Sequence, residues 1–537
     1  MKERCIIIPA IKKNAVIPDQ LVKKLSGITL MERALNTARA VVPTKDIITL
    51  TDSQEISLIC ERIGSCFHLN KDLKFKSLDI INEMQGLLEE LSRIYAHSII
   101  LRASCPLLTW IDVENAWKDY KKTNADSLIT VRNIRQRIWN INEGTLNDAI
   151  YGNDTNQEFL IESRALIILN LKKRLSQQKK IIPFYLDEHA IEIQSYQDWW
   201  ICEHLLKRRH IVFVVAGYPA IGMGHVYRAL MLAHEITDHK VTFVCTNKSE
   251  LAVDSLASKD YHVIRQGKEE LYQTVLSLKP DLVINDFLNT PLSYMQALKN
   301  AKIRCINFED DGQGIKYANL VINALYEKQS GNKKIKYGED YFCLRDEFLD
   351  AKQNILRDCV RTILITFGGT DQNDASRRIL NIIEPIARAY GIKIRIVAGP
   401  GYAHRKKMEL HLKKLENPLI SFTWATNAMS NMMEGADLAI CSAGRTVYEL
   451  AHMRIPAMVL AHHEREARHT FVRPKNGFAF VGIMDKITDT KIRNVFLAML
   501  KQDRRARFWK RQTTLDFTKN KAKVIRLILK TLLKDET

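Results

Sequence analysis

The stretch "HIVFVVAGYPAIGMGHVYRALMLAHEI", residues 210–236, decides the fold class of the second half of this chain. The unbroken apolar run at 211–216 predicts a strand that is buried on both faces. Apolar residues then recur at helical spacing over 226–236 and predict a helix. Gly222 and Gly224 allow a tight turn between the two elements. A strand, a glycine turn and a helix form the repeating unit of a parallel sheet that helices cover.

The start of this helix is a candidate anion site. Unpaired N–H groups and the positive end of the helix dipole point at whatever binds there. Gly222 and Gly224 let a ligand approach the backbone closely. His225 stands beside the same turn, and histidine suits proton transfer because its ordinary pKa lies near neutrality. The alternative is a plain helix entry with a surface histidine, and the spacing alone leaves both open.

Two later segments repeat the unit, "TILITFGGTD" (362–371) and "ICSAGRTVYEL" (440–450). Gly368 and Gly369 form the turn of the first segment. The second brings small residues to a helix start and a carboxylate one turn later; these are Ser442, Gly444, Thr446 and Glu449. Small residues can hold a pyrophosphate there, and the carboxylate can reach ribose hydroxyls. The alternative is a capped helix, with Thr446 as the cap and Glu449 as its partner.

Acidic and histidine-rich segments follow other predicted strands. Asp286, the fourth residue of "VINDF" (283–287), stands at a predicted strand end and is placed to orient or polarise a catalytic group. Glu309, Asp310 and Asp311 either line a cleft or belong to a solvated loop. The segment "HHEREARH" (462–469) is expected to face the same cleft. Its spacing matches no standard zinc motif, so we expect no metal site there.

The first two hundred residues show the same alternation. Predicted strands at 5–11, 46–52 and 97–103 alternate with amphipathic helices at 30–41 and 78–96. This pattern predicts a parallel sheet with helices on both faces.

Domain boundaries follow from where these series end. A short strand and a helix at 191–209 close the first series, and a long helical pattern at 347–360 links the two later ones. We therefore expect three parts, 1–206, 207–360 and 361–537.

Composition limits the class of protein. At 537 residues the chain exceeds one compact core, and its 46% hydrophobic and 26% charged residues are typical of soluble globular proteins. No apolar run approaches the roughly 18 residues of a membrane span. The apolar run at the N-terminus is too short for a signal peptide. Ten cysteines without CxxC spacing indicate reduced thiols, so we expect a cytoplasmic protein.

The formal net charge of +19 points to an anionic partner. Much of the excess lies in 501–534, which we expect to form terminal helices with a solvated charged face. The alternative is contact of these basic helices with a membrane surface. No nucleic-acid-binding motif accompanies the charge, so we expect no nucleic acid partner. No pattern in the sequence fixes an oligomeric state.

Five motifs in the second half carry a resemblance to a known family. In chain order they are "IGMGHVYRALMLA", "VINDF", "YGEDYFCLRDEF" (337–348), "ITFGGTD" and "SAGRTVYEL". Over about 210–485 the chain resembles the UDP-sugar hydrolases of pseudaminic acid biosynthesis, which have the two-lobed GT-B fold and look like the lipid II-forming glycosyltransferase. Those enzymes use water to release UDP from a UDP-linked diacetamido trideoxy sugar.

The resemblance implies roles for several residues. His225 would be the catalytic histidine, the turn from Gly444 to Glu449 would hold UDP, and Arg228 would help to bind phosphate. In the segment 462–469 this chain departs from the Asn-Gln pair that family members usually carry, which implies a different sugar. No cofactor is expected for this half, because UDP is a good leaving group.

The first domain resembles CMP-sialic acid synthetases and related cytidylyltransferases, which have a single GT-A or Rossmann-like α/β domain. The likeness rests on "CIIIPAIKKNAVIPDQLVKKLSGITLMERALNTA", "LRASCPLLTWIDVENA", "ADSLITVRN" and "IEIQSYQDWWICEHLL". It implies binding of CTP with Mg²⁺, and the candidate nucleotide-binding residues are Lys12, Lys13 and Arg102. The glycines of the family's first loop are absent. The late acidic motif stands here as Glu192 and Gln194, and the neutral Gln194 is a poor Mg²⁺ ligand.

The sequence thus predicts an α/β protein of nonulosonic (sialic-like) acid metabolism, a nucleotidyltransferase-like domain followed by a GT-B module. We expect the GT-B module to hydrolyse a UDP-linked amino sugar, with His225 as general base. The first domain is either an active CMP-sugar synthetase or a degenerate binding domain. Two rivals remain: a GT-B glycosyltransferase acting on a surface glycan, and a non-catalytic nucleotide-sugar-binding subunit.

Overall fold

The structure is a computed structural model that describes residues 1–12, 17–71, 80–133, 139–142, 145–148, 160–173, 180–218, 221–327, 331–426 and 428–533. The chain forms two compact units that meet at Arg208 and Arg209. Unit 1 comprises the residues up to Arg208, and unit 2 those from Arg209 onward.

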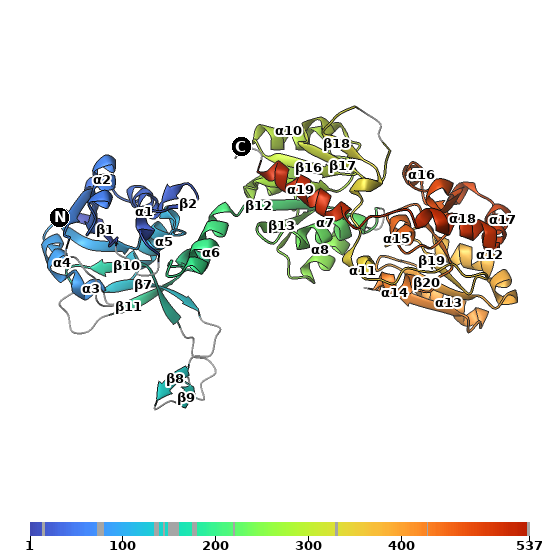
Figure 1. Ribbon diagram of the computed structural model, residues 1–537, viewed down its shortest axis with the longest axis horizontal. Coiled ribbons are helices and arrows are strands. Elements are labelled where there is room, and N and C mark those ends of the chain that lie inside the picture. Colours follow the sequence, from blue (N-terminus) through green and yellow to red (C-terminus); the bar gives the residue numbers. More distant parts are fainter. Residues whose placement is uncertain are drawn as a thin grey trace. The chain divides into compact units, whose positions relative to one another are not determined.

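Unit 1 is built around one seven-stranded sheet (Figure 1). Its strands in spatial order are β11 (Ile181–Tyr185), β7 (Ser127–Asn133), β10 (Leu160–Asn170), β6 (Tyr95–Leu101), β1 (Lys2–Ala10), β4 (Ile47–Thr51) and β5 (Cys66–Leu69). Its helices are α1 (Leu30–Arg39), α2 (Gln54–Ile63), α3 (Ile80–Glu83), α4 (Gln85–Ser92), α5 (Trp110–Lys121) and α6 (Tyr196–Lys207). A separate two-stranded pair, β8 (Trp139–Asn142) and β9 (Thr145–Asp148), stands between β7 and β10 in the sequence.

Three sequence expectations for unit 1 are corrected. The sheet is mixed rather than parallel, because β10 runs antiparallel to both β6 and β7. The predicted helix 78–96 is instead two helices, α3 and α4, and α4 ends at Ser92, since Tyr95 and Ala96 enter β6, a buried strand. The expected strand at 191–194 does not form, and these residues are an irregular segment before α6.

Unit 2 has two lobes, each an α/β layer structure with an all-parallel sheet. The N-terminal lobe has seven strands: β14 (Val263–Arg265), β13 (Lys240–Cys245), β12 (His210–Val215), β15 (Leu282–Asp286), β16 (Arg304–Phe308), β17 (Leu320–Asn323) and β18 (Ile335–Tyr337). Its helices are α7 (Gly224–His234), α8 (Glu250–Ala257), α9 (Leu271–Ser277) and α10 (Leu292–Asn300). The apolar run after His210 forms the central strand β12, which is buried because it pairs with β13 and β15.

The C-terminal lobe has six strands: β21 (Ile420–Trp424), β20 (Lys393–Ala398), β19 (Thr362–Thr366), β22 (Leu438–Ser442), β23 (Ala457–Ala461) and β24 (Phe478–Ile483). Its helices are α12 (Ala375–Ala389), α13 (Arg405–Leu415), α14 (Met429–Met433), α15 (Thr446–His452), α16 (Glu464–Ala467), α17 (Asp489–Leu500) and α18 (Gln502–Gln512).

The segment that joins the lobes is less helical than its sequence predicts. Within 347–360 the helix α11 (Asp346–Leu349) ends after one turn, and the chain continues without regular structure. Asn354 explains this path, because its side chain bonds the carbonyls of Met433 and Met453 and the N–H of Gly435. These bonds to the C-terminal lobe replace the helical ones that the pattern favoured.

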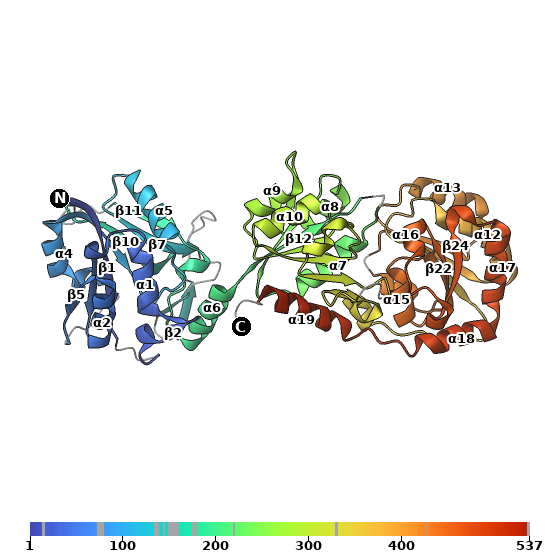
Figure 2. The same ribbon diagram turned by 90° about the horizontal axis from the view of Figure 1, so that it is seen from above.

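The last helix, α19 (Asn520–Leu532), leaves the C-terminal lobe and lies along the N-terminal lobe (Figures 1 and 2). Val524, Ile528 and Leu532 are buried in the core of that lobe. Lys521 pairs with Glu235, beside the end of α7. The expected part 361–537, a C-terminal lobe plus basic terminal helices, thus ends in a helix that packs on the N-terminal lobe. Because the apolar face of α19 is already buried within the protein, a membrane could meet only its charged face.

The predicted fold class is confirmed: an α/β domain precedes a two-lobed GT-B module. All ten cysteines are free. Across the described ranges, no helix has both the length and the apolar character needed to cross a bilayer.

Candidate functional site

The strand order of the N-terminal lobe brings His225 and Asp286 together. From β12 the chain moves outward to β13 and β14 and then returns to place β15 on the other side of β12. The crevice between two strands whose connections diverge in this way is the usual ligand site of an open α/β sheet. His225 lies in the first turn of α7, which follows β12, and Asp286 is the last residue of β15.

His225 and Asp286 form a hydrogen-bonded pair. The Nδ1 of His225 donates to Oδ1 of Asp286 at 2.6 Å, and the Asp286 side chain is 1% exposed. Burial alone would raise the pKa of the Asp286 carboxyl, but the adjacent Arg228 and His225 lower it below its ordinary value. The ionised carboxylate fixes the proton on Nδ1. The Nε2 of His225 bonds no other described residue.

Arg228, which the sequence resemblance associated with phosphate, lines the cavity described below and pairs with two buried carboxylates. Its guanidinium donates to both oxygens of Asp286, at 2.5 and 2.7 Å, and to Glu309 at 3.0 Å. It also lies over the ring of Phe308. The side chain is 3% exposed, and both carboxylates compensate its charge. Arg228 therefore holds Asp286 in place, and its charge is committed to buried carboxylates rather than to a phosphate.

The three acids after β16 have different surroundings. Glu309 lines the cavity described below, and its carboxylate accepts from Arg228 and from the Ala324 N–H. Asp310 is buried and accepts from the backbone and hydroxyl of Thr290, so it is structural. Asp311 is exposed.

The C-terminal lobe repeats the same topology, with its strand order diverging between β19 and β22. Gly368 and Gly369 follow β19, and Gly368 has a φ of 78°, which glycine adopts without strain. A Cβ on Gly369 would stand 3.3 Å from the backbone nitrogen of Met223. The two lobes are therefore in close backbone contact here, next to the turn formed by Gly222 and Gly224.

The turn after β22 carries Ser442, Gly444 and Thr446 to the start of α15. No side chain caps this helix, so the pair of Thr446 and Glu449 does not form the capping box that we considered as an alternative. His469 supports the turn instead, because its Nδ1 donates to the carbonyl of Ala443 at 2.6 Å. Burial lowers the pKa of His469, which keeps the ring neutral.

Glu449 is held by a residue that the sequence analysis did not single out. Arg345 donates to its Oε1 from Nε at 3.0 Å, and its Nη2 lies 2.9 Å from the same atom. The other oxygen, Oε2, accepts no hydrogen bond from the described residues. Arg345 also pairs with Glu347. Both belong to the "YGEDYFCLRDEF" motif, which therefore acts as the support for this carboxylate.

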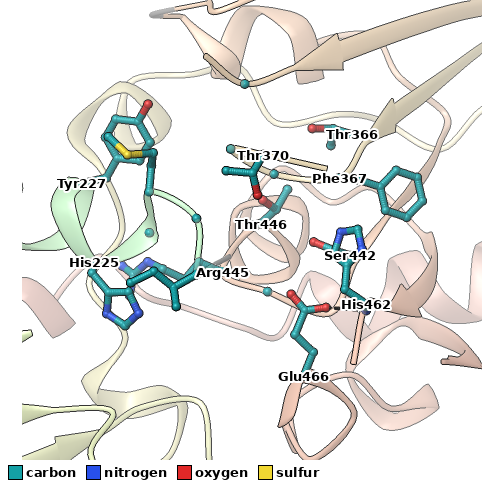
Figure 3. Close-up of a pocket in the computed structure, with 18 of the residues that line it drawn as sticks. His225, Tyr227, Thr366, Phe367, Thr370, Ser442, Arg445, Thr446, His462 and Glu466 are labelled. Atoms are coloured by element: carbon teal, nitrogen blue, oxygen red, sulfur yellow. Dashed lines mark hydrogen bonds between the residues drawn. The ribbon is translucent and has the colours of Figure 1, made fainter. Parts of the chain in front are cut away.

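These groups surround one cavity of about 480 Å³ between the lobes, a size typical of small-molecule sites. Figure 3 shows His225 and Tyr227 approaching from α7, opposite Ser442, Thr446, His462 and Glu466 of the C-terminal lobe. The predicted residues that line the cavity are Gly222, Gly224, His225, Arg228, Gly368, Gly369, Ser442, Gly444, Thr446 and Glu449. Asp286 lies behind His225 and does not line it.

Two cavity residues carry unused hydrogen-bonding capacity. The Nη1 of Arg445 and both ring nitrogens of His462 are buried and have no partner among the described residues. Burial, followed by the nearby Arg228 cation, lowers the pKa of Arg445 to about 10. Arg445 stays charged at neutral pH, and an anion in the cavity would stabilise it. Both residues lie within the motifs "SAGRTVYEL" and "HHEREARH", but no pattern in the sequence marks either one as a ligand-binding residue.

Two of the candidate residues of unit 1 lie next to carboxylates. Lys12 pairs with Glu55 at 2.7 Å and with Asp19 at 3.3 Å. Lys13 lies outside the described residues. Arg102 lies 3.8 Å from Glu192. Across the described ranges, no group of three or more His, Cys, Asp or Glu residues is arranged to hold a metal.

Comparison with known proteins finds relatives for parts of the chain. No protein-family model matches. The chain is 27% identical over 272 residues to uncharacterized protein MJ1062 of Methanocaldococcus jannaschii, covering 47% of this chain and 56% of that protein. It is 28% identical over 271 residues to the spore coat polysaccharide biosynthesis protein SpsG of Bacillus subtilis, covering 48% and 78%. A segment of 78 residues is 31% identical to the 3-deoxy-manno-octulosonate cytidylyltransferase of Koribacter versatilis, covering 14% and 30%.

Among solved structures, MurG of Acinetobacter baumannii superposes on 60% of this chain and 99% of its own, with a TM-score of 0.44 and 16% identity. A CMP:2-keto-3-deoxy-manno-octonic acid synthetase superposes on 38% of this chain and 99% of its own, with a TM-score of 0.31 and 12% identity. The chain spans about half the length of MJ1062.

Proposed function

We propose that unit 2 hydrolyses a UDP-linked amino sugar to the free sugar and UDP, as a step in glycan precursor synthesis. The observation that carries this proposal is the pair of His225 and Asp286 at the edge of a cavity rich in anion-binding groups. An oriented histidine backed by a buried carboxylate is the arrangement of a general base.

The reaction assigns one role to each group. The Nε2 of His225 accepts a proton from water while the water oxygen attacks the anomeric carbon of the sugar. The bond from that carbon to the β-phosphate oxygen breaks, and UDP leaves with the electron pair. Asp286 stabilises the imidazolium that forms, and Arg228 keeps Asp286 ionised. The proton then leaves His225 for solvent.

Protein groups stabilise the leaving diphosphate. The N-terminus of α7 at Gly224 supplies unpaired N–H groups and the positive end of the helix dipole. The turn from Ser442 to Thr446 supplies small residues, and Arg445 supplies a cation with a free Nη1. Glu449 offers Oε2 to the ribose hydroxyls. These groups supply the positive charge that a bound metal provides in other nucleotide-sugar enzymes, so we propose no cofactor for this unit.

The relatives support the general part of the proposal, a role in nucleotide-sugar chemistry for glycan synthesis. One is named for polysaccharide biosynthesis and another for cytidylyl transfer to an eight-carbon acidic sugar. Both names are consistent with nucleotide-sugar chemistry in glycan synthesis. We extend the substrate proposal to amino sugars that are precursors of nonulosonic acids on the sequence resemblance alone.

The test measures UDP release from a panel of UDP-linked amino sugars, without any acceptor, by the parent protein and by His225→Ala. We expect release by the parent and none above background by the variant. The matched control is His234→Ala, which removes an exposed histidine from the same helix. Reaction in ¹⁸O-labelled water should place the label in the sugar and not in UDP.

Two outcomes would overturn hydrolysis. No release by the parent, followed by release when glycan acceptors or membranes are added, would indicate a glycosyltransferase on the same fold. Recovery of unchanged nucleotide-sugar under all conditions, together with measurable binding, would indicate a non-catalytic subunit.

A further inference from the structure

Unit 1 has a crevice of the same topological kind as the two lobes of unit 2. Strand β1 pairs in parallel with β4 on one side and with β6 on the other, so the connections diverge between β1 and β6. Ligands of open α/β sheets bind outside the carboxyl ends of such strands. Arg102 directly follows β6 at this position.

Two arginines face one carboxylate there. The Oε1 of Glu192 lies 3.8 Å from Nη1 of Arg102. Its Oε2 lies 3.9 Å from Nη1 of Arg164. Ser104 donates its hydroxyl to Oε1 at 3.2 Å, and the Gln194 amide donates to Oε2 at 2.8 Å. Both oxygens of Glu192 are thus already engaged, and its side chain is only 14% exposed.

This arrangement does not fit the Mg²⁺ that the sequence resemblance implies. A magnesium site needs carboxylate or other oxygen ligands that are free to bind. Here two guanidinium groups lie within 4 Å of Glu192 and would repel a divalent cation. Gln194 turns its amide nitrogen, a donor, toward Glu192. We therefore derive no cytidylyl transfer from this site.

The charge balance suits an anion instead. Two cations oppose one carboxylate, which leaves one positive charge uncompensated within the cluster. The Nε of Arg102 is buried and has no partner among the described residues. Arg164 occupies the left-handed region at φ 56°, inside the register irregularity of β10 between Glu162 and Ile167. The arginine that lies next to Glu192 is thus at an irregular point of strand β10.

We propose that Arg102, Arg164 and Glu192 form a metal-independent site for an oxyanion, the carboxylate of an acidic sugar or the phosphate of a cytidine nucleotide. The guanidinium groups supply the positive charge that Mg²⁺ supplies in a metal-dependent transferase, and their planar donors match a carboxylate or phosphate. Unit 1 then binds its ligand without activating it. Glu192 competes with the ligand for both arginines and so weakens its binding.

The test is isothermal titration of the full-length protein with two probes, CMP and N-acetylneuraminic acid, in EDTA and again in MgCl₂. We expect at least one probe to bind equally well in both buffers, and the identity of that probe distinguishes phosphate from carboxylate. Arg102→Gln and Arg164→Gln should each weaken this binding by about tenfold or more. Arg62→Gln, which removes an exposed arginine on α2, is the control for the same charge change.

The decisive variant is Glu192→Gln, because the two interpretations predict opposite signs. An oxyanion site gains affinity when the competing carboxylate is removed, whereas a magnesium site loses it. Circular dichroism of each variant checks that it is folded. Binding that needs Mg²⁺ and disappears in Glu192→Gln would overturn the proposal. Binding that none of the three cluster variants changes would place the ligand elsewhere, and no binding of either probe at millimolar concentration would also overturn it.

This test is independent of the reaction proposed for unit 2, because it measures binding and not UDP release. Failure of the hydrolase assay therefore leaves the result for unit 1 unaffected, and the reverse also holds.

Discussion

Gly224, the first residue of α7, lies directly against the side chain of Arg445 from the opposite lobe. A Cβ on Gly224 would stand 3.1 Å from Cδ of Arg445, closer than ordinary van der Waals contact. The N-terminus of a helix and a partly unpaired guanidinium therefore meet at one point of the cavity. This contact between lobes is the structural basis for proposing that a diphosphate binds there.

Gly224→Ala should weaken UDP binding by about tenfold. The new methyl shifts the Arg445 side chain, and this weakens the charged hydrogen bond proposed between its guanidinium and the diphosphate. Titration with UDP measures the effect. Gly86→Ala, at an exposed glycine with open space around it, should leave UDP affinity unchanged. Equal UDP affinity of Gly224→Ala and the parent would contradict a role for this contact.

Asp286→Asn should lower the rate of UDP release by roughly 10³- to 10⁴-fold, because an amide neither fixes the Nδ1 proton nor stabilises the imidazolium. The KM should change much less, since Asp286 does not line the cavity. Steady-state kinetics separates the two parameters. Asp254→Asn, at an exposed position on α8, serves as the control for loss of one carboxylate. A variant that loses affinity but keeps its rate would argue against the proposed role of Asp286.

The same carboxyl makes stability depend on pH. Because its pKa is lowered from 3.8 in the folded protein, Asp286 contributes stability above pH 3.8 and loses that contribution as the pH falls through the lower folded value. The difference in melting temperature between the parent and Asp286→Asn should stay constant from about pH 7 to 5 and shrink below about pH 4. Calorimetric scans of the unit 2 transition test this. A melting-temperature difference that grows as the pH falls below about 4 would contradict a lowered pKa of Asp286 in the folded protein.

His462→Phe should weaken nucleotide-sugar binding without destabilising the free protein. Both imidazole nitrogens are buried without described partners, so an apolar ring of similar shape leaves no polar group unsatisfied. We expect a melting temperature equal to or above that of the parent and a KM about three- to tenfold higher. Thermal melts and initial rates give the two values. A clear drop in melting temperature would mean that His462 has a structural partner.

Ile528→Ala should destabilise unit 2 by about 2–5 kcal/mol, because Ile528 is fully buried where α19 packs on the N-terminal lobe. Lys530→Ala, on the exposed face of the same helix, should change stability by less than about 0.5 kcal/mol. Denaturant unfolding of both variants makes the comparison. Similar stabilities for the two variants would indicate that the packing of α19 on the N-terminal lobe does not stabilise unit 2.

The sequence by itself determined the local units. Apolar runs that end in glycine turns predicted β12, β19 and β22 and the helices that follow them, because burial on both faces of a parallel sheet demands such runs. Most of the predicted cavity residues were found for the same reason, since ligand sites of these sheets follow the strand ends. The segment 347–360 was predicted wrongly as a helix, because helical periodicity does not reveal the bonds that Asn354 makes to the carboxyl ends of two distant helices, α14 and α15.

Only the tertiary structure decided which polar groups are paired. Strand order, which residue patterns do not encode, brings Asp286 to His225 and commits Arg228 to two buried carboxylates. The same reason explains why Glu192, placed by sequence in a metal motif, is found between two arginines, one of which is on β10. A charge acts through its neighbours in space, and the fold chooses those neighbours.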